Sequence, residues 1–278
     1  MTNNLLGSNR DEFDNVLKIV IEIGNKLVGK PNLEADTNLV YAEGLGKKII
    51  GHSLSARYLY DGFQIAIKSE IFVPRVDFPS IIILTRAALE SYLTFHYLFI
   101  APKNDCEKEF RFLCWDLSGY LDRENAEATR KEYIELKESE KKRILELKKE
   151  IREHDYLKLR GEKIIELALD GQWRLKNSWS KLAVNAGFNK AFFDKQYKFL
   201  CGYAHSSRLS VIQIQQTKTV QNERNMADAS LGVLQMILSK YIYDYVNLIP
   251  ELKKVVDFNT SEYYKILVWY NVCKSLDK

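Results

Sequence analysis

The sequence predicts an all-α protein: an irregular bundle of several helices with one long, charged helical arm. Two observations lead to this fold class. Only 5 prolines and 13 glycines interrupt the 278 residues, so the segments between helix-breaking residues are long. Within these segments apolar residues recur at intervals of three and four, which is the spacing of one face of an amphipathic helix. Strand-like alternation of apolar and polar residues is hard to find.

Residues that start or end helices divide the chain into predicted elements. Gly29 and then Pro31 follow the first helix in the order typical of a helix C-terminus. Asp77 or Ser80 is suited to cap the most apolar helix, which Pro102 closes. The predicted helices span residues 11–28, 33–69 (one bent helix or two), 80–100, 105–122, 179–186, 190–204, 223–246 and 261–275.

Charge is concentrated in one segment. Residues 123–153 contain ten Lys or Arg and nine Glu without a proline or glycine, which predicts a long solvated helix. Glu127 precedes Lys131 by four residues, an order that stabilises a helix by ~0.2–0.5 kcal/mol. The apolar stripe is too interrupted for a sustained coiled coil. We interpret residues 1–278 as a single helical domain with residues 123–160 as a protruding charged arm, which is suited to a homodimer contact or to a protein partner.

Composition excludes several classes of protein. The formal net charge of +4 is too small and too dispersed for a nucleic-acid footprint, so RNA is only weakly supported as a partner. The 4 cysteines contain no C-x-x-C pair, which favours free buried thiols in a reducing compartment.

The ends and apolar segments of the chain bear on its location. Residues 1–10 lack the basic start and apolar stretch of a signal peptide. The most apolar segment, residues 81–100, is interrupted by Arg86, Glu90 and His96, so it predicts a buried helix and not a membrane span. We therefore expect a cytoplasmic protein with no membrane partner.

The first candidate site is an ion pair within that apolar helix. Arg86 and Glu90 are four residues apart, and helical rotation places Tyr97 on the same face. Burying an ion pair is costly unless it is well hydrogen-bonded. The pair therefore predicts either a structural polar network or a ligand pocket.

The second candidate site is the segment YKFLCGYAHSSRLS. Tyr197, Cys201 and His205 follow one another at intervals of four and should line one helix face, with His205 at its end. A neutral imidazole there is suited to general acid or base chemistry, and Arg208 is suited to meet a phosphate. The alternative is a histidine that caps the helix C-terminus, where the helix dipole favours a cation.

Other residues carry weaker signals. His52 and His154 fit surface or packing positions. The H-E-x-x-H, C-x-x-C, G-x-S-x-G and G-x-x-x-x-G-K-[ST] motifs are absent, which disfavours zinc hydrolases, α/β hydrolases and P-loop enzymes. We expect neither a metal nor a cofactor.

Three motifs in order resemble a family of bacterial helical proteins known only as a domain of unknown function. They are the R-x-x-x-E helix at Arg86 and Glu90, the S-W-S-K segment around Trp179, and Tyr197 with the Y-A-H-S segment around His205. The resemblance spans roughly residues 80–210. It implies an all-helical fold, and it marks Trp179 and Tyr197, with Arg86, Glu90 and His205, as recurring positions of unassigned role.

A looser resemblance is to HEPN-type helical proteins of bacterial defence and toxin systems, whose ribonucleases use an arginine, four to six residues and then a histidine. This sequence departs from that pattern, because nine residues separate Arg86 from His96 and lysine replaces arginine in the pair Lys198 and His205.

These observations favour a helical-bundle interaction or regulatory protein with an internal Arg/Glu/His polar site. The alternative is a HEPN-like, metal-independent ribonuclease with His205 as general acid or base and Arg86 or Arg208 stabilising phosphate charge. In that case the catalytic residues are His205, Arg86 and Glu90, and the ligand-binding residues are Tyr97, Trp179, Tyr197 and Arg208. A third hypothesis is a partner-binding toxin or antiviral defence component.

Overall fold

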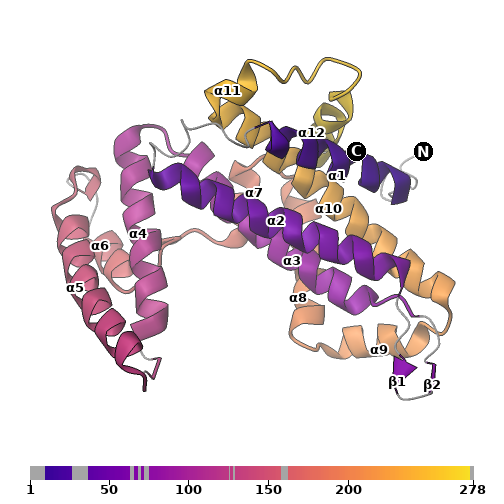
Figure 1. Ribbon diagram of the computed structural model, residues 1–278, viewed down its shortest axis with the longest axis horizontal. Coiled ribbons are helices and arrows are strands. Elements are labelled where there is room, and N and C mark those ends of the chain that lie inside the picture. Colours follow the sequence, from indigo (N-terminus) through magenta and orange to yellow (C-terminus); the bar gives the residue numbers. More distant parts are fainter. Residues whose placement is uncertain are drawn as a thin grey trace. The chain divides into compact units, whose positions relative to one another are not determined.

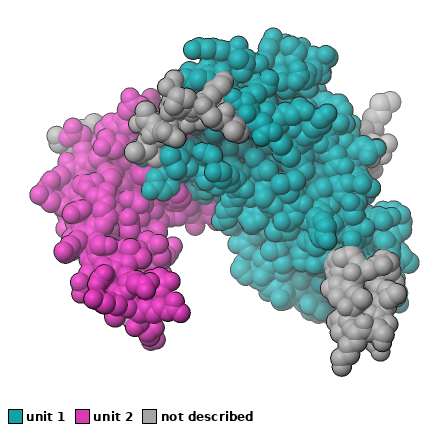
Figure 2. Space-filling view, in the orientation of Figure 1, with its two compact units in different colours: residues 1–96, 182–278 teal, residues 97–181 magenta. Residues whose placement is uncertain are grey.

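The chain forms two compact units, coloured separately in Figure 2. Unit 1 comprises residues 1–96 and 182–278, and unit 2 comprises residues 97–181. The computed structural model describes residues 10–26, 37–62, 66–67, 70–71, 75–124, 126–127, 129–157 and 162–275. The single domain predicted for residues 1–278 stays a prediction.

Unit 1 is built almost entirely from helices (Figure 1). It contains α1 (Arg10–Asn25), α2 (Thr37–Asp61), α3 (Phe78–Phe95), residues 182–185 of α7 (Trp179–Asn185), α8 (Lys190–Ala204), α9 (Arg208–Gln216), α10 (Val220–Leu248), α11 (Pro250–Lys253) and α12 (Tyr264–Ser275), with two short antiparallel strands, β1 (Ala66–Ile67) and β2 (Glu70–Ile71). The predicted all-α fold class is confirmed.

The core of unit 1 lies around α3 and α10. α3 packs against α2, α8 and α10, while α10 also packs against α1, α2 and α12. α2 is one helix that runs through its glycines and ends at Asp61. The helix predicted for residues 33–69 was therefore wrong at its end, where Ala66–Ile67 forms a strand. A Cβ added at Gly46 would overlap the Tyr241 hydroxyl of α10. Since Tyr241 is buried and packs edge-on against Phe95, glycine is required for this close approach of α2 and α10.

The start of α3 follows the expected capping chemistry. The Asp77 side chain accepts a hydrogen bond from the backbone N–H of Ser80 (3.1 Å), and Pro79 occupies the first turn, where no amide donor is needed. After Phe95 the helix continues as a π-helix, η2 (His96–Ile100). The helix predicted for residues 80–100 therefore exists, but its last turn is wound more loosely.

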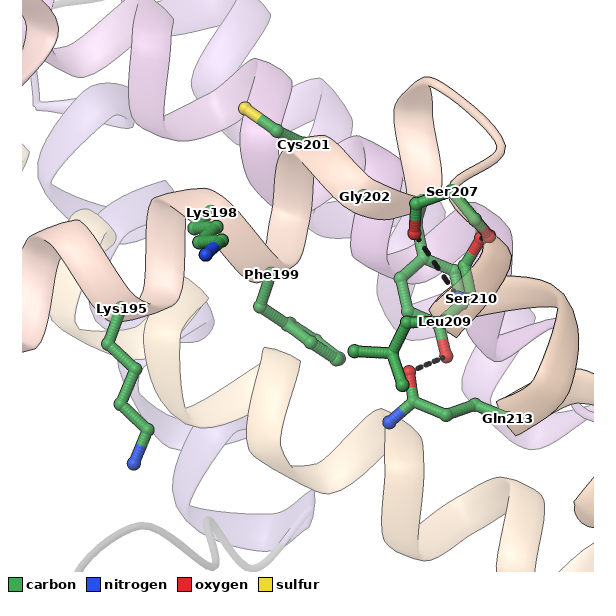
Figure 3. Close-up of a pocket in the computed structure, with 10 residues that line it drawn as sticks. Lys195, Lys198, Phe199, Cys201, Gly202, Ser207, Leu209, Ser210 and Gln213 are labelled. Carbon is green, nitrogen blue, oxygen red and sulfur yellow. Dashed lines mark hydrogen bonds between the residues drawn. The ribbon is translucent and has the colours of Figure 1, made fainter.

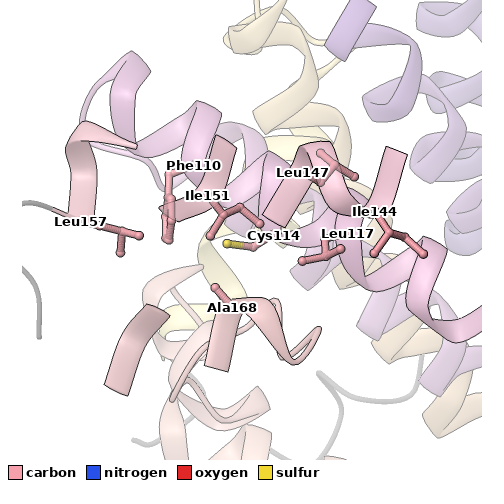
Figure 4. Close-up of a cluster of buried hydrophobic side chains, with 8 residues drawn as sticks. All are labelled: Phe110, Cys114, Leu117, Ile144, Leu147, Ile151, Leu157 and Ala168. Carbon is pink, nitrogen blue, oxygen red and sulfur yellow. The ribbon is translucent and has the colours of Figure 1, made fainter. Parts of the chain in front are cut away.

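Unit 2 has its own apolar core. α4 (Asp105–Glu124) packs against α5 (Lys131–Glu153), the short 3₁₀ segment η3 (Asp155–Leu157) and α6 (Glu162–Leu169). Their contact buries eight side chains, shown in Figure 4: Phe110, Cys114, Leu117, Ile144, Leu147, Ile151, Leu157 and Ala168. Residues 123–160, expected as a protruding solvated arm, thus include a helix with one face buried against α4 and α6 and a charged face exposed. This helix begins at Lys131 and not at residue 123, so Glu127 lies outside it and the predicted helical pair with Lys131 was wrong.

Some elements escaped the sequence-based prediction. α6, α9 and α11 are short, and the period of apolar residues is weak evidence over so few turns. All four cysteines are free, with Cys114 and Cys273 buried. No helix in the described ranges combines the length and apolar character that crossing a bilayer requires.

Candidate functional site

The packing of α8 against α3 brings the two predicted sites together. On α3, the Arg86 Nε donates to Glu90 Oε1 at 2.9 Å. From α8, the Tyr197 hydroxyl donates to the same Glu90 oxygen at 2.7 Å, and Arg86 Nη1 lies 3.1 Å from His205 Nε2. We call these four residues the α3–α8 cluster.

The Arg86–Glu90 pair is only partly buried. The two side chains are 21% and 27% exposed. Burial opposes the charge on Arg86, but the hydrogen bond and charge of Glu90 outweigh it, so the pKa of Arg86 is raised. Burial, followed by the hydrogen bond to Glu90, raises the pKa of Tyr197. The guanidinium is therefore charged and the phenol protonated around neutral pH.

A hydrogen bond between Arg86 and His205 depends on the state of the imidazole. Arginine has no acceptor and only donates, so His205 Nε2 must accept. An imidazolium carries protons on both ring nitrogens and has no acceptor. The contact thus requires a neutral ring with its proton on Nδ1, and the side chain itself is exposed.

The end of α8 holds His205 in place. His205 is the C-cap residue, and its backbone N–H donates to Cys201 at 3.0 Å, so the expectation that it ends this helix is confirmed. The next residue, Ser206, has a left-handed backbone (φ 50°), and the Ser207 N–H returns to the Gly202 carbonyl at 2.8 Å. This is the Schellman arrangement, with serine where glycine is usual.

Two predicted ligand residues, Tyr97 and Trp179, lie in unit 2. Tyr97 is buried in η2, where its hydroxyl donates to the Trp173 carbonyl (3.4 Å) and the Arg111 guanidinium lies 4.2 Å from its ring. Because η2 is a π-helix, the 100° rotation used to align Tyr97 with Glu90 does not hold there. The ring of Trp179 lies 6.1 Å from that of Trp173.

Arg208, the remaining predicted ligand residue, is the first residue of α9 and is exposed. Within the described part of the chain, no hydrogen bond or ion pair joins it to the α3–α8 cluster. No group of three or more His, Cys, Asp or Glu side chains among the described residues is arranged to hold a metal ion.

A second polar group of unit 1 was missed by the sequence analysis. Lys240 on α10 is 0% exposed, and its Nζ has no hydrogen-bond partner among the described residues. The Nζ lies 4.2 Å from the centre of the Tyr270 ring and 5.1 Å from that of Phe188. One turn on, buried Asp244 accepts a 2.7 Å hydrogen bond from the Tyr92 hydroxyl.

The electrostatics of this second group are dominated by burial. Burial lowers the pKa of Lys240, and the nearby charges of Cys273 and Asp244 only partly oppose this. Burial raises the pKa of Asp244 to about 6 against the hydrogen bond from Tyr92 and the charge of Lys240. The spacing of Lys240 and Asp244 in the sequence does not indicate a buried group, because a Lys and an Asp four residues apart also fit an exposed helix face.

Fold and site define an all-helical protein with a polar cluster formed between two helices. The model of a family of unknown function (DUF5677) matches residues 53–219, more than half of the 278 residues. The chain belongs to this family, as the three motifs predicted. The matched range contains the whole α3–α8 cluster. No curated protein and no solved structure matched the chain, and the looser resemblance to HEPN-type proteins is not supported.

Proposed function

We propose that this chain is a helical interaction or regulatory protein whose α3–α8 cluster binds a small ligand through an anionic group. One observation carries the proposal: a charged arginine, held on one side by Glu90, lies 3.1 Å from a ring nitrogen of His205 at a partly exposed position.

The orientation of Arg86 supports anion recognition. Glu90 fixes the guanidinium through its Nε, and Tyr197 fixes Glu90 in turn. A planar guanidinium that is already oriented loses little conformational freedom on binding a carboxylate or phosphate. The Nδ1–H of exposed His205 supplies a neighbouring donor. Glu90 already balances the charge of Arg86. The affinity of a ligand must therefore come from directed hydrogen bonds more than from attraction to a net positive charge.

Isothermal titration with inorganic phosphate tests this proposal. We expect saturable binding to the wild-type chain and a loss of roughly tenfold or more in affinity for Arg86→Lys and for His205→Ala, because a hydrogen bond to a charged group contributes ~1.5–3 kcal/mol. Lys253→Gln, an exposed change on α11, is the control and should bind as wild type. Equal binding by all four proteins, or no binding by the wild type, would contradict the proposal.

The alternative is a metal-independent ribonuclease, favoured by the 3.1 Å approach of Arg86 to His205 across 119 residues of sequence. A neutral imidazole is suited to take a proton from a ribose hydroxyl while a guanidinium stabilises phosphate charge. Incubation of the wild type and His205→Ala with RNA in the presence of a chelator decides this. Cleavage by the wild type alone supports a nuclease, whereas intact RNA in both reactions excludes it.

For the cellular role, we propose a cytoplasmic component of a bacterial defence or toxin system that forms a homodimer or binds a protein through residues 123–160. Support comes from the start of α5, where Tyr133, Ile134 and Leu136 are 51%, 45% and 50% exposed. Light scattering of the wild type and Tyr133→Glu tests the contact: the wild type should have twice the chain mass and the variant should not. A monomeric wild type would contradict the dimer.

A further inference from the structure

A pocket lies between α8 and α9 (Figure 3). Its volume is about 540 Å³, which lies within the ~300–1,000 Å³ of small-molecule sites. The side chains of Phe199 and Leu209 point toward one another across it. Lys195, Lys198 and Gln213 are among its other lining residues.

α8 divides its residues between the pocket and the cluster. Lys195, Lys198, Phe199 and Gly202 line the pocket and share one helix face by their spacing of three and four. None of the four residues of the α3–α8 cluster is among those that line the pocket. Cys201 also lines the pocket, although its sulfur lies on the other side of the α8 ribbon from Phe199 (Figure 3). The pocket is therefore a site separate from the α3–α8 cluster.

Polar atoms of the pocket wall form hydrogen bonds with one another. The Tyr203 hydroxyl donates to Gln213 Oε1 at 3.1 Å, and the Ser210 hydroxyl donates to the Ser207 carbonyl at 2.8 Å. Burial raises the pKa of Tyr203 to about 12, so its hydroxyl keeps its proton and this donor role. With these groups occupied, the interior between Phe199 and Leu209 suits an apolar moiety.

The margin of the pocket is basic. Lys195 and Lys198 are both exposed, and within the described chain neither has a hydrogen bond or an ion pair. Two exposed lysines with no ion pair in the described chain, beside an apolar interior, complement a ligand that carries a negative charge at one end.

We propose that the α8–α9 pocket binds a small amphipathic anion, with an apolar ring or short chain between Phe199 and Leu209 and a carboxylate, sulfonate or phosphate near Lys195 and Lys198. This site is additional to the α3–α8 cluster and does not depend on anion binding by Arg86.

A fluorescence titration with 8-anilinonaphthalene-1-sulfonate, an aromatic sulfonate, tests the proposal on the full chain. We expect one saturable site on the wild type. The variant Lys195→Glu with Lys198→Glu should bind about tenfold more weakly at low salt, because each exposed charge contact contributes modestly and is screened by salt. Lys253→Glu with Lys254→Glu makes the same charge change on exposed residues of the α11 region and should bind as wild type.

Two further measurements separate the apolar and charged parts of the site. N-Phenyl-1-naphthylamine, a neutral molecule of similar shape, should bind the wild type and the Lys195/Lys198 variant equally. Leu209→Asp changes a residue that is 59% exposed, so the fold should persist, and it should abolish binding of both dyes. Circular dichroism checks that each variant is folded.

Several results would overturn the proposal. One is that the Lys253/Lys254 variant binds the sulfonate as weakly as the Lys195/Lys198 variant does. Another is unaltered binding by folded Leu209→Asp, and a third is no saturable binding by the wild type. None of these variants alters Arg86, Glu90 or His205, so failure here leaves the phosphate titration of the α3–α8 cluster interpretable.

Discussion

Unit 1 contains two groups of charged side chains that differ in how their charge is accommodated. In the α3–α8 cluster, Arg86 and Glu90 keep part of their surface in solvent and are joined by a direct hydrogen bond. On α10, Lys240 is fully buried, has aromatic rings around its ammonium and has no hydrogen-bond partner in the described chain.

The difference shows where a charge is costly. A solvated, hydrogen-bonded pair costs little to fold and leaves donors for a ligand. A desolvated ammonium and carboxylate reduce stability unless their protonation changes. This difference supports the binding proposed for the α3–α8 cluster, and it predicts pH-dependent stability from Lys240 and Asp244.

The largest effect should come from Asp244→Asn. The folded pKa of about 6, against an ordinary 3.8, corresponds to ~3 kcal/mol. A raised carboxyl pKa contributes stability that is complete below about pH 4 and is lost as pH rises through about 6. Asparagine keeps an acceptor for Tyr92 without this loss. Urea denaturation followed by circular dichroism gives the free energy of unfolding of each protein. As pH rises from 4 to 7, this free energy should increase for the variant relative to the wild type by up to ~3 kcal/mol.

Parallel stability curves for the wild type and Asp244→Asn across this range would show that the buried carboxyl does not titrate as assigned. Asp228→Asn is the matched control, because Asp228 accepts a similar bond from Tyr60 (2.7 Å) at a partly buried position. Its free energy of unfolding is measured over the same pH range as that of Asp244→Asn.

Tyr92→Phe should have the next largest effect. It removes the donor to Asp244 within the core, and an unsatisfied buried acceptor costs ~1–3 kcal/mol. Tyr60→Phe removes the equivalent bond at the partly buried site and should cost less. Free energies of unfolding for both variants at pH 7 measure this difference. Equal losses would mean that burial does not distinguish the two hydrogen bonds.

Arg86→Ala should lower stability by only ~1 kcal/mol, since partly exposed ion pairs contribute little and Tyr197 still donates to Glu90. Thermal unfolding measures the change. A loss above ~3 kcal/mol, typical of breaking a fully buried pair, would assign this residue to the structural core and remove the distinction from Lys240.

Ser206→Gly should stabilise the chain slightly, by ~0.5–1 kcal/mol, because glycine takes a left-handed backbone without a Cβ penalty. Ser139→Gly, an exposed change inside helix α5, is the opposite control and should cost ~0.5 kcal/mol. Calorimetric melting temperatures compare the two. A loss of stability in Ser206→Gly would mean that its side chain, and not the turn, matters there.

The sequence predicted what depends on neighbouring residues. Arg86 and Glu90 are one helical turn apart, so their bond follows from helix geometry alone. The cap at Asp77 and the helix end at His205 follow from local backbone chemistry in the same way. Placing His205 beside Arg86 required the packing of α8 against α3, which no local pattern specifies, and only the family resemblance grouped these residues.

The rest could not be predicted because it depends on which element covers which face. Lys240 and Asp244 fit a solvated face until Tyr270 and Cys273 of α12 cover α10. The α8–α9 pocket depends on the turn at Ser206, where no glycine marks a left-handed residue. On α5, the interrupted apolar stripe was visible, but its burial depends on α4 and α6.

A hydrogen bond from Arg86 to His205 requires one tautomer of the imidazole, and that tautomer can be measured. Long-range ¹H–¹⁵N NMR distinguishes protonated from unprotonated ring nitrogens among the 4 histidines, and His205→Gln assigns the signal. We predict that the neutral ring has its proton on Nδ1 and an unprotonated Nε2, and that Arg86→Ala removes this preference. A proton on Nε2 in the wild type would contradict the arrangement on which the proposed site depends.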